Sequence, residues 1–144
     1  MRCLGVDRGE KRTGIAVSDS LGIMATPVSV IENSDENLVI LEILTVANQY
    51  EVDCIVVGMP RSLNGELGVQ ALKVASFVKK LAAVFQEKSR RQVEIKTWDE
   101  RFSTAAAQKS MTEAGMSHRK SRKHIDSLAA TYILQHFLDS EKQD

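Results

Sequence analysis

Acidic residues stand at three points of this sequence where a purely structural acid is uncommon. Asp7 follows a short apolar run, Asp99 and Glu100 follow another, and Asp126 lies near the start of a helical pattern. A carboxylate in such a place must be protonated, paired with a cation or bound to a metal, because an unpaired buried charge is costly. Oxygen ligands alone suit Mg²⁺ or Mn²⁺ rather than zinc. Acids brought together from these three points therefore predict a divalent-metal site.

Each acid also has a structural interpretation of its own. Asp7 could stabilise the glycine loop that follows it, and Asp99 could be an ordinary turn residue. Asp126 shares a helix face with the apolar Ala130 and Phe137, and it could interact there with the helix dipole or a nearby arginine. A metal, in contrast, accounts for all three acids at once, because clustered carboxylates repel one another unless a cation joins them.

The pair Asp99 and Glu100 presents a choice that the sequence alone leaves open. Along a strand, successive side chains point to opposite faces of the sheet. The two acids therefore face opposite sides, and periodicity does not show which side holds the site.

Two clusters of basic residues flank the proposed metal ligands. The segment "GVDRGEKRTG" places Arg8, Lys11 and Arg12 beside Asp7, and "HRKSRKHID" places four more cations directly before Asp126: Arg119, Lys120, Arg122 and Lys123. A run of charge is often only a solvated loop. Beside acids that bind a metal, however, it suits a substrate with a polyphosphate backbone, so we predict that these residues contact nucleic acid.

The overall composition indicates an ordinary globular protein. The 144 residues are 43% hydrophobic and 26% charged, with a formal net charge of zero. We expect one domain over residues 1–144, with any electrostatic attraction of a substrate arising from local clusters. The two cysteines, Cys3 and Cys54, have no metal-ligand spacing and are expected to be buried in a reducing compartment. No segment reads as a signal peptide or membrane span, so we expect a cytoplasmic protein.

The elements that must position these residues follow from the apolar patterns. Strands are predicted over residues 3–6, 15–18, 27–31, 53–58 and 93–98, with a long loop between the first two. Helices are predicted from an Asn33 cap, over residues 69–86, from Ser103 to about Gly115, and over residues 125–138.

This order predicts an α/β fold. Three strands joined by turns suit an antiparallel meander, and the fourth and fifth strands each arrive through a helix, so they should lie parallel to the first. The result is a mixed five-stranded sheet flanked by helices. The carboxyl ends of strands one and five would then meet the beginning of the last helix, where active sites gather in open α/β sheets.

Four separate motifs follow one another along the chain: "GVDRGEKRTGIAVSD", "VVGMPRSLNGELG", "DERFSTAAAQ" and "KHIDSLAATYILQHFLD". In this order they resemble the YqgF-type family, whose members carry the labels Holliday junction resolvase and pre-16S rRNA nuclease. The resemblance implies an RNase H-like fold related to RuvC-type resolvases. It also implies that Asp7, Glu100 and Asp126 are the metal-binding acids, which favours Glu100 over Asp99.

The function implied by the resemblance is metal-dependent hydrolysis of phosphodiester bonds with Mg²⁺ or Mn²⁺, by a mechanism that uses two ions. Processing of the 5′ end of pre-16S rRNA is the first expectation, and resolution of four-way DNA junctions is the alternative. Structured RNA or branched DNA is thus the expected partner, bound by a monomer or a homodimer. Two rivals remain: a sugar-kinase-like ATPase, for which the chain is too short, and an RNA-binding assembly factor without catalysis.

Overall fold

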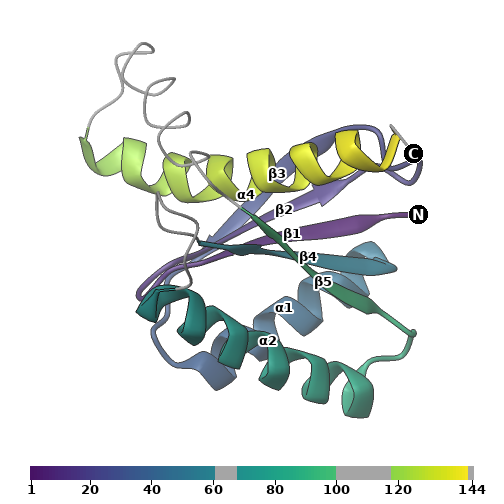
Figure 1. The fold of residues 1–144 in the computed structure, drawn as a ribbon, viewed down its shortest axis with the longest axis horizontal. Helices are drawn as coiled ribbons and strands as arrows, with labels where there is room; N and C mark the ends of the chain where they lie inside the picture. Colours follow the sequence, from purple (N-terminus) through teal and green to yellow (C-terminus); the bar gives the residue numbers. More distant parts are fainter. Residues whose placement is uncertain (61–67, 100–117, 143–144) are drawn as a thin grey trace.

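A mixed five-stranded sheet lies between one long helix and a pair of helices (Figure 1). The computed structural model describes residues 1–60, 68–99 and 118–142, of which residues 118–127 and 142 are described by their backbone alone. The elements in this part of the chain are β1 (Cys3–Arg8), β2 (Thr13–Ser18), β3 (Ala25–Ile31), α1 (Glu36–Tyr50), β4 (Cys54–Met59), α2 (Val69–Lys88), β5 (Glu94–Asp99) and α4 (His118–Lys142).

The strand order is β3-β2-β1-β4-β5. β1 pairs antiparallel with β2, and β2 with β3, whereas β4 pairs parallel with both β1 and β5. This arrangement confirms the predicted sheet of three antiparallel and two parallel strands. Helix α4 covers one face, and α1 and α2 cover the other (Figure 1).

The apolar residues of the central strands serve both faces of the sheet. In β1, Leu4 and Val6 pack toward α1 and α2, whereas Cys3 packs toward α4. Because side chains alternate along a strand, an apolar run buried on both faces is needed where helices cover both sides. The same alternation sends Asp7 to the α4 face and Arg8 to the face of α1 and α2.

Gly5 allows α4 to approach the backbone of β1. A Cβ atom at Gly5 would lie 2.8 Å from the Cβ of Leu134 and 2.9 Å from the carbonyl oxygen of Ala130. Such distances are shorter than a side chain tolerates, so only glycine fits here. The contact also fixes the level at which α4 crosses β1.

Several predicted element ends differ from the structure. β1 extends to Arg8 and β2 begins at Thr13, so the turn of residues 9–12 is short and the predicted long loop is wrong. The cap of α1 is Asp35, whose side chain accepts from the backbone N–H groups of Asn37 and Leu38, whereas Asn33 accepts from the N–H of Asp35. The helix predicted from residue 103 lies outside the described residues.

The start of α4 is also earlier than predicted. The helix begins at His118, so the basic segment that was expected to be a loop is its first turns. Asp126 consequently stands two turns inside the helix and not at its beginning. The helix dipole therefore explains an acid at position 126 less well, because the dipole effect fades beyond the first turn of a helix.

The two cysteines are free and buried, as predicted. They are register partners on the parallel strands β1 and β4, which the sequence did not show. A hydrogen bond with Cys3 and burial raise the pKa of the Cys54 thiol, so this thiol is protonated at neutral pH. Within the described part of the chain, no helix is long and apolar enough to cross a membrane.

Candidate functional site

Asp7 is the first of the predicted acids, and its side chain faces α4. It is the penultimate residue of β1, half-buried, and the register partner of Gly14 on β2. Gly5, two positions earlier on the same face, lies against Ala130 and Leu134. Asp7 therefore lies beyond the closest contact between β1 and α4, toward the carboxyl end of the strand.

The backbone brings the Asp126 position to the same place. α4 runs antiparallel to β1, since Leu138 lies near the N-terminal end of β1 and Gly5 lies between Ala130 and Leu134. Two residues along a strand advance about 6.6 Å, and one helical turn rises about 5.4 Å. A step from Gly5 to Asp7 thus moves at least one turn back along α4, toward position 126. The side chain of Asp126 lies outside the described residues.

The orientation of β5 shows which face of the sheet carries Asp99. Trp98 meets Phe137 of α4 edge-on with ring centroids 5.7 Å apart, and the Lys96 ammonium lies 5.4 Å from the same ring. The even positions of β5 therefore face α4, and Asp99 lies on the opposite face together with Ile95. Glu100 lies outside the described residues.

On the α4 side, the last residue of β4 is a glycine. Gly58 is buried and pairs with Trp98, and it directly follows Val57, the register partner of Val6. Because Gly58 has no side chain, β4 contributes no side chain to the α4 face at this position. Among the side chains that the structure describes, no group of three metal-binding residues gathers, which is expected because Glu100 and Asp126 are not in that set.

The structure separates the three cations of the β1–β2 turn. Arg8 faces α2, and its guanidinium lies 5.3 Å from the centre of the Phe77 ring. Arg12 lies 3.6 Å from a carboxylate oxygen of Glu32. Lys11 is exposed to solvent. Asp7 and its neighbouring cations thus do not form one cluster, and a phosphate contact for each cation stays a prediction.

The four cations of the second cluster lie on the first turns of α4. Their side chains are not among those described, but helical spacing places positions 119, 122 and 123 on the face that carries Asp126, with position 120 to one side. This face continues toward Ala130 and the sheet. Three of the four basic positions thus precede Asp126 along one helix face.

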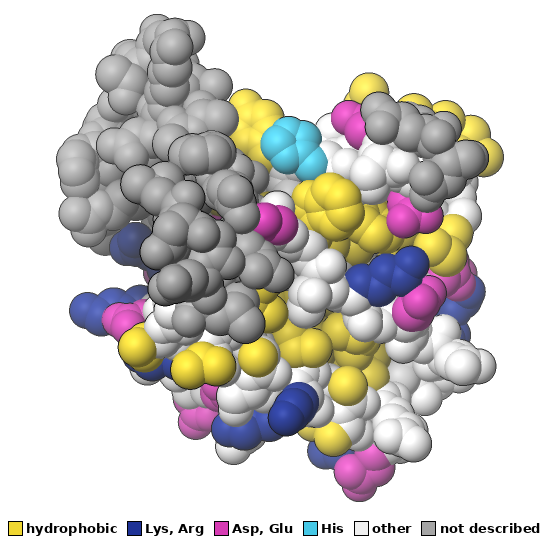
Figure 2. Space-filling view, in the orientation of Figure 1, with side chains coloured by type: hydrophobic (Ala, Val, Ile, Leu, Met, Phe, Trp, Pro, Cys, Tyr) yellow, Lys and Arg dark blue, Asp and Glu magenta, His cyan; other side chains and the backbone are white. Residues whose placement is uncertain are grey.

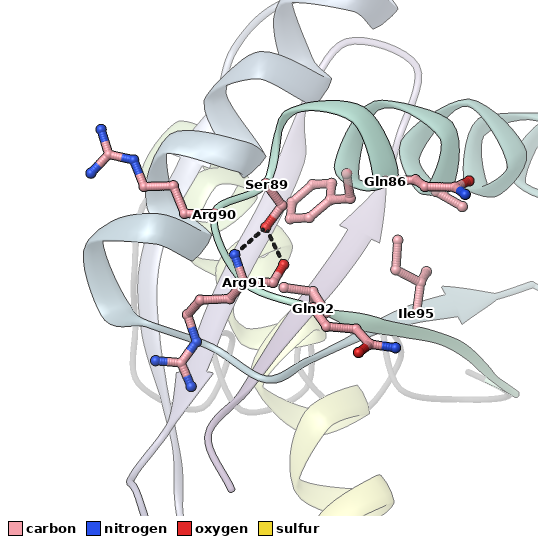
Figure 3. A pocket seen from close by; sticks show the side chains of 9 residues that line it. Gln86, Ser89, Arg90, Arg91, Gln92 and Ile95 are labelled. Carbon is pink, nitrogen blue, oxygen red and sulfur yellow. Dashed lines mark hydrogen bonds between the residues drawn. The ribbon is translucent and has the colours of Figure 1, made fainter.

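One cavity lies at the other end of the sheet from Asp7. It has a volume of about 600 Å³ and lies between the end of α2 and the start of β5. Arg90 and Arg91 border it, yet their guanidinium groups extend away from Ile95 (Figure 3). Arg91 pairs with Asp53, and the pKa of that carboxyl is lowered by the backbone N–H of Arg2 and by Arg91. The cavity therefore does not gather these cations into an anion site.

A smaller cavity of about 300 Å³ borders the β1–β2 turn, on the side away from α4. Arg8 and Lys73 contribute positive charge to it, and Glu10 and Glu36 contribute negative charge. On the face shown in Figure 2, the described Lys and Arg side chains are likewise interspersed with Asp and Glu. Neither this cavity nor this face adds a strongly basic surface to the one predicted on α4.

Two residues that support the turn were not singled out in the sequence. Phe77 lies under Arg8, and Thr13, whose side chain is fully buried, accepts a hydrogen bond from Arg8 at 3.3 Å. The available signal was weak: a threonine directly after a basic turn, and a phenylalanine on the apolar face of a helix. Neither pattern by itself indicates a contact between distant segments.

Comparisons with known proteins show related sequences along nearly the whole chain. A model of the RuvX family, described as Holliday junction resolvase, matches residues 1–140. A protein of Clostridium botulinum named "Putative pre-16S rRNA nuclease" is 44% identical over 140 residues, which are 97% of this chain and 98% of that protein.

Two solved structures of Thermus thermophilus RuvC are similar in fold. The first has a TM-score of 0.56 at 14% identity and covers 99% of this chain and 97% of its own. The second, in complex with Holliday junction substrate, has a TM-score of 0.58 at 16% identity and covers 99% of this chain and 96% of its own. At this level of identity the likeness concerns the fold alone, and it confirms the predicted RNase H-like class.

Proposed function

Because this chain belongs to the RuvX family of Holliday junction resolvases, we propose that it is a metal-dependent nuclease that uses Asp7, Glu100 and Asp126. One observation carries this proposal above the others: β1 presents Asp7 to α4 at the level where the helix backbone reaches position 126. The nearness of Asp7 to the backbone at position 126 supports a site that both acids share.

The alternation of β5 supports Glu100 as the third acid. Trp98 faces α4, so the next position on that face of an extended strand is 100 and not 99. The family resemblance favours the same residue. Asp99 faces the other side of the sheet and is not a metal ligand in this proposal.

These three carboxylates fit Mg²⁺ or Mn²⁺, because the donor set contains only oxygen atoms and carries a charge that a divalent cation offsets. Asp7, Glu100 and Asp126 would hold two such ions, which would supply an activated water and stabilisation of the leaving oxygen of the phosphodiester. The chain itself contributes the ligands and the means to hold the substrate. The basic positions on α4 precede Asp126 along one helix face, so they would bind phosphates next to the scissile one.

The substrate that we propose is the precursor of 16S rRNA, cleaved at its 5′ end. The name of the Clostridium botulinum relative supports this choice, since the two chains align over nearly their whole lengths. Cleavage is expected to leave a 5′-phosphate and a 3′-hydroxyl, as the RNase H-like resemblance implies.

Four-way DNA junctions are the second candidate substrate, which the description of the family favours. A junction requires two nicks related by symmetry, and hence a dimer, whereas trimming of RNA does not. Light scattering of the protein with each substrate therefore separates the two candidates. A dimer that forms only on junction DNA would favour the second.

The test is cleavage of both substrates side by side in Mg²⁺ and in Mn²⁺, with the 5′-end precursor RNA and a four-way junction at equal concentration. We expect cleavage of the RNA, and its loss when the metal is chelated. Binding of RNA without cleavage under every metal condition would instead identify an assembly factor without catalysis. Hydrolysis of ATP would point to the kinase-like alternative.

A further inference from the structure

The cations of the β1–β2 turn have different surroundings, and these surroundings indicate different roles. We infer that Arg8 is a positioning residue that fixes this turn to α2, and that Lys11 is the cation of the turn that contacts substrate phosphate. The inference rests on the proposed nuclease function, because it concerns how that site receives its substrate.

Arg8 lies on the opposite face of β1 from Asp7. Its guanidinium stacks over Phe77, a fully buried residue of α2, at 5.3 Å from the ring centre. A guanidinium over an aromatic face is attracted by the ring electrons. Since α2 occupies that side, Arg8 turns its charge toward the protein core and away from the α4 face that Asp7 shares.

The same guanidinium holds both ends of the turn. Its Nη1 atom donates to the carbonyl oxygen of Gly9, directly after β1, and to the hydroxyl of Thr13, the first residue of β2. Thr13 is fully buried, so this bond satisfies a hydroxyl that water does not reach. Loss of Arg8 would leave this buried hydroxyl without its donor and the turn without its attachment to α2.

The backbone closes the turn tightly over this support. The N–H of Gly9 donates to the carbonyl oxygen of Arg12 at 2.9 Å, and a Cβ atom at Gly9 would lie 2.7 Å from that oxygen. The turn therefore has one compact shape. A backbone fixed at both ends also fixes where the side chains at its tip begin.

The other charged residues of the turn have partners. Arg12 pairs with Glu32 at 3.6 Å, and Glu10 pairs with Lys73 at 3.5 Å. Lys11 is exposed and makes no ion pair with any residue in the described part of the chain. Of the three cations beside Asp7, Lys11 is thus the one presented to solvent, on a turn whose geometry Arg8 maintains.

The first experiment measures binding without cleavage. In an Asp7→Asn background, the dissociation constant of a labelled precursor RNA is determined at a series of KCl concentrations. We expect Lys11→Gln to reduce the slope of log K against log salt by about 0.7–0.9, the value of one phosphate contact. Arg8→Gln should leave the slope unchanged. Lys79→Gln, on an exposed position of α2, is the matched control and should also leave it unchanged.

The second experiment measures turnover with Asp7 intact. A displaced turn misplaces bound substrate, so Arg8→Gln should lower kcat by about ten- to a hundredfold while KM changes less than twofold. Phe77→Leu removes the ring under Arg8 and should lower kcat in the same way. Arg8→Lys, which keeps the charge over the ring, should recover part of kcat. If Arg8→Gln does not fold, Arg8→Lys takes its place in the comparison with the wild type.

Three results would overturn the inference. The first is a salt slope that falls in Arg8→Gln as it does in Lys11→Gln, which would make Arg8 a phosphate contact. The second is an unchanged slope in Lys11→Gln. The third is an unchanged rate of amide hydrogen exchange at Gly9 in Arg8→Gln. If Arg8 positions the turn, its loss must weaken the hydrogen bond from the Gly9 N–H to the Arg12 carbonyl oxygen and speed this exchange. The exchange measurement needs no substrate, so it still decides the role of Arg8 if wild-type protein binds no nucleic acid and the proposed function fails.

Discussion

At the scale of single residues, Gly5 determines whether β1 and α4 can form one site. A methyl group there would meet the Cβ of Leu134 at 2.8 Å and the Ala130 carbonyl oxygen at 2.9 Å. Gly5→Ala should therefore push the helix from the sheet and lower the free energy of unfolding by about 1–3 kcal/mol. Urea unfolding measures this loss. Cleavage should fall as well, because position 126 moves away from Asp7.

Gly68→Ala is the matched control for this substitution. A Cβ atom at Gly68 would meet nothing within 4 Å. Its effect on the free energy of unfolding should stay within about 1 kcal/mol, the usual range for a change at a helix cap. Equal losses in the two variants would show that the close approach at Gly5 is not what limits the packing of α4.

The residue types of the site were predictable from the sequence, but their grouping was only partly so. Asp7 was recognised because an acid directly after an apolar strand costs free energy unless it is protonated, paired with a cation or bound to a metal. Arg8 was grouped with it because the strand was expected to end at Val6. Since β1 extends to Arg8, alternation separates the two neighbours onto opposite faces. The partner of Arg8 is Phe77, a contact between distant segments that periodicity cannot reveal.

At the scale of elements, the first turns of α4 provide the second predicted contact with nucleic acid. We propose replacement of all four cations, Arg119, Lys120, Arg122 and Lys123, by glutamine, a good helix former that keeps the helix while it removes the charge. If each contacts a phosphate, the slope of log K against log salt should fall by about 3–4 units. The rate at saturating substrate should change much less, because no metal ligand is lost.

A control for these substitutions removes charge elsewhere. Lys79, Lys88 and Arg90 are exposed residues of α2 and the loop after it. Their triple replacement by glutamine should change the salt slope by less than about one unit. If both sets of substitutions lower the slope alike, the attraction reflects overall charge and α4 is not a specific contact surface.

The loop between β2 and β3 gives a prediction on pH. One carboxylate oxygen of Asp19 accepts from the backbone N–H groups of Ile23 and Met24, at 2.7 and 3.2 Å, and these bonds lower the pKa of Asp19. A lowered pKa in the folded state stabilises the protein above the ordinary value of about 4. This contribution is lost as the pH falls through the lowered pKa.

Asp19→Ala tests this effect. The variant should be less stable than the wild type at pH 7, and the difference should shrink as the pH falls below about 4. Urea unfolding at a series of pH values measures it. A difference that stays constant down to pH 2 would show that the carboxylate charge contributes nothing to the loop.

Most elements were predictable because their apolar patterns are continuous. The buried run of β4 and the helical spacing of α2 are examples, and both agree with the structure within a few residues. Helix α4 was predicted too short because its first turns contain charged and polar residues without an apolar repeat. The cap of α1 was misplaced because Asn33 and Asp35 are both good caps, and the fold chooses between them.

At the scale of the whole molecule, the sheet and α4 together bring distant segments to one edge. β1 supplies Asp7, α4 supplies the position of Asp126, and β5 pairs with β4 up to its last residue, Asp99. Asp7 and Asp126 are more than one hundred residues apart in sequence. The nearness of Asp7 to the backbone at position 126 supports our proposal that the two acids belong to one site.

The central claim is that this edge cleaves phosphodiester bonds with the help of Asp7 and a divalent metal. The most direct measurement is cleavage of the pre-16S 5′-end RNA by wild type and by Asp7→Asn, purified in parallel, in Mg²⁺ and after chelation with EDTA. We expect cleavage by the wild type in Mg²⁺ alone, and a loss of at least about a thousandfold in the variant, with an unchanged or slightly raised melting temperature. Cleavage that survives Asp7→Asn, or an Asp7→Asn variant that melts well below the wild type, would contradict the account.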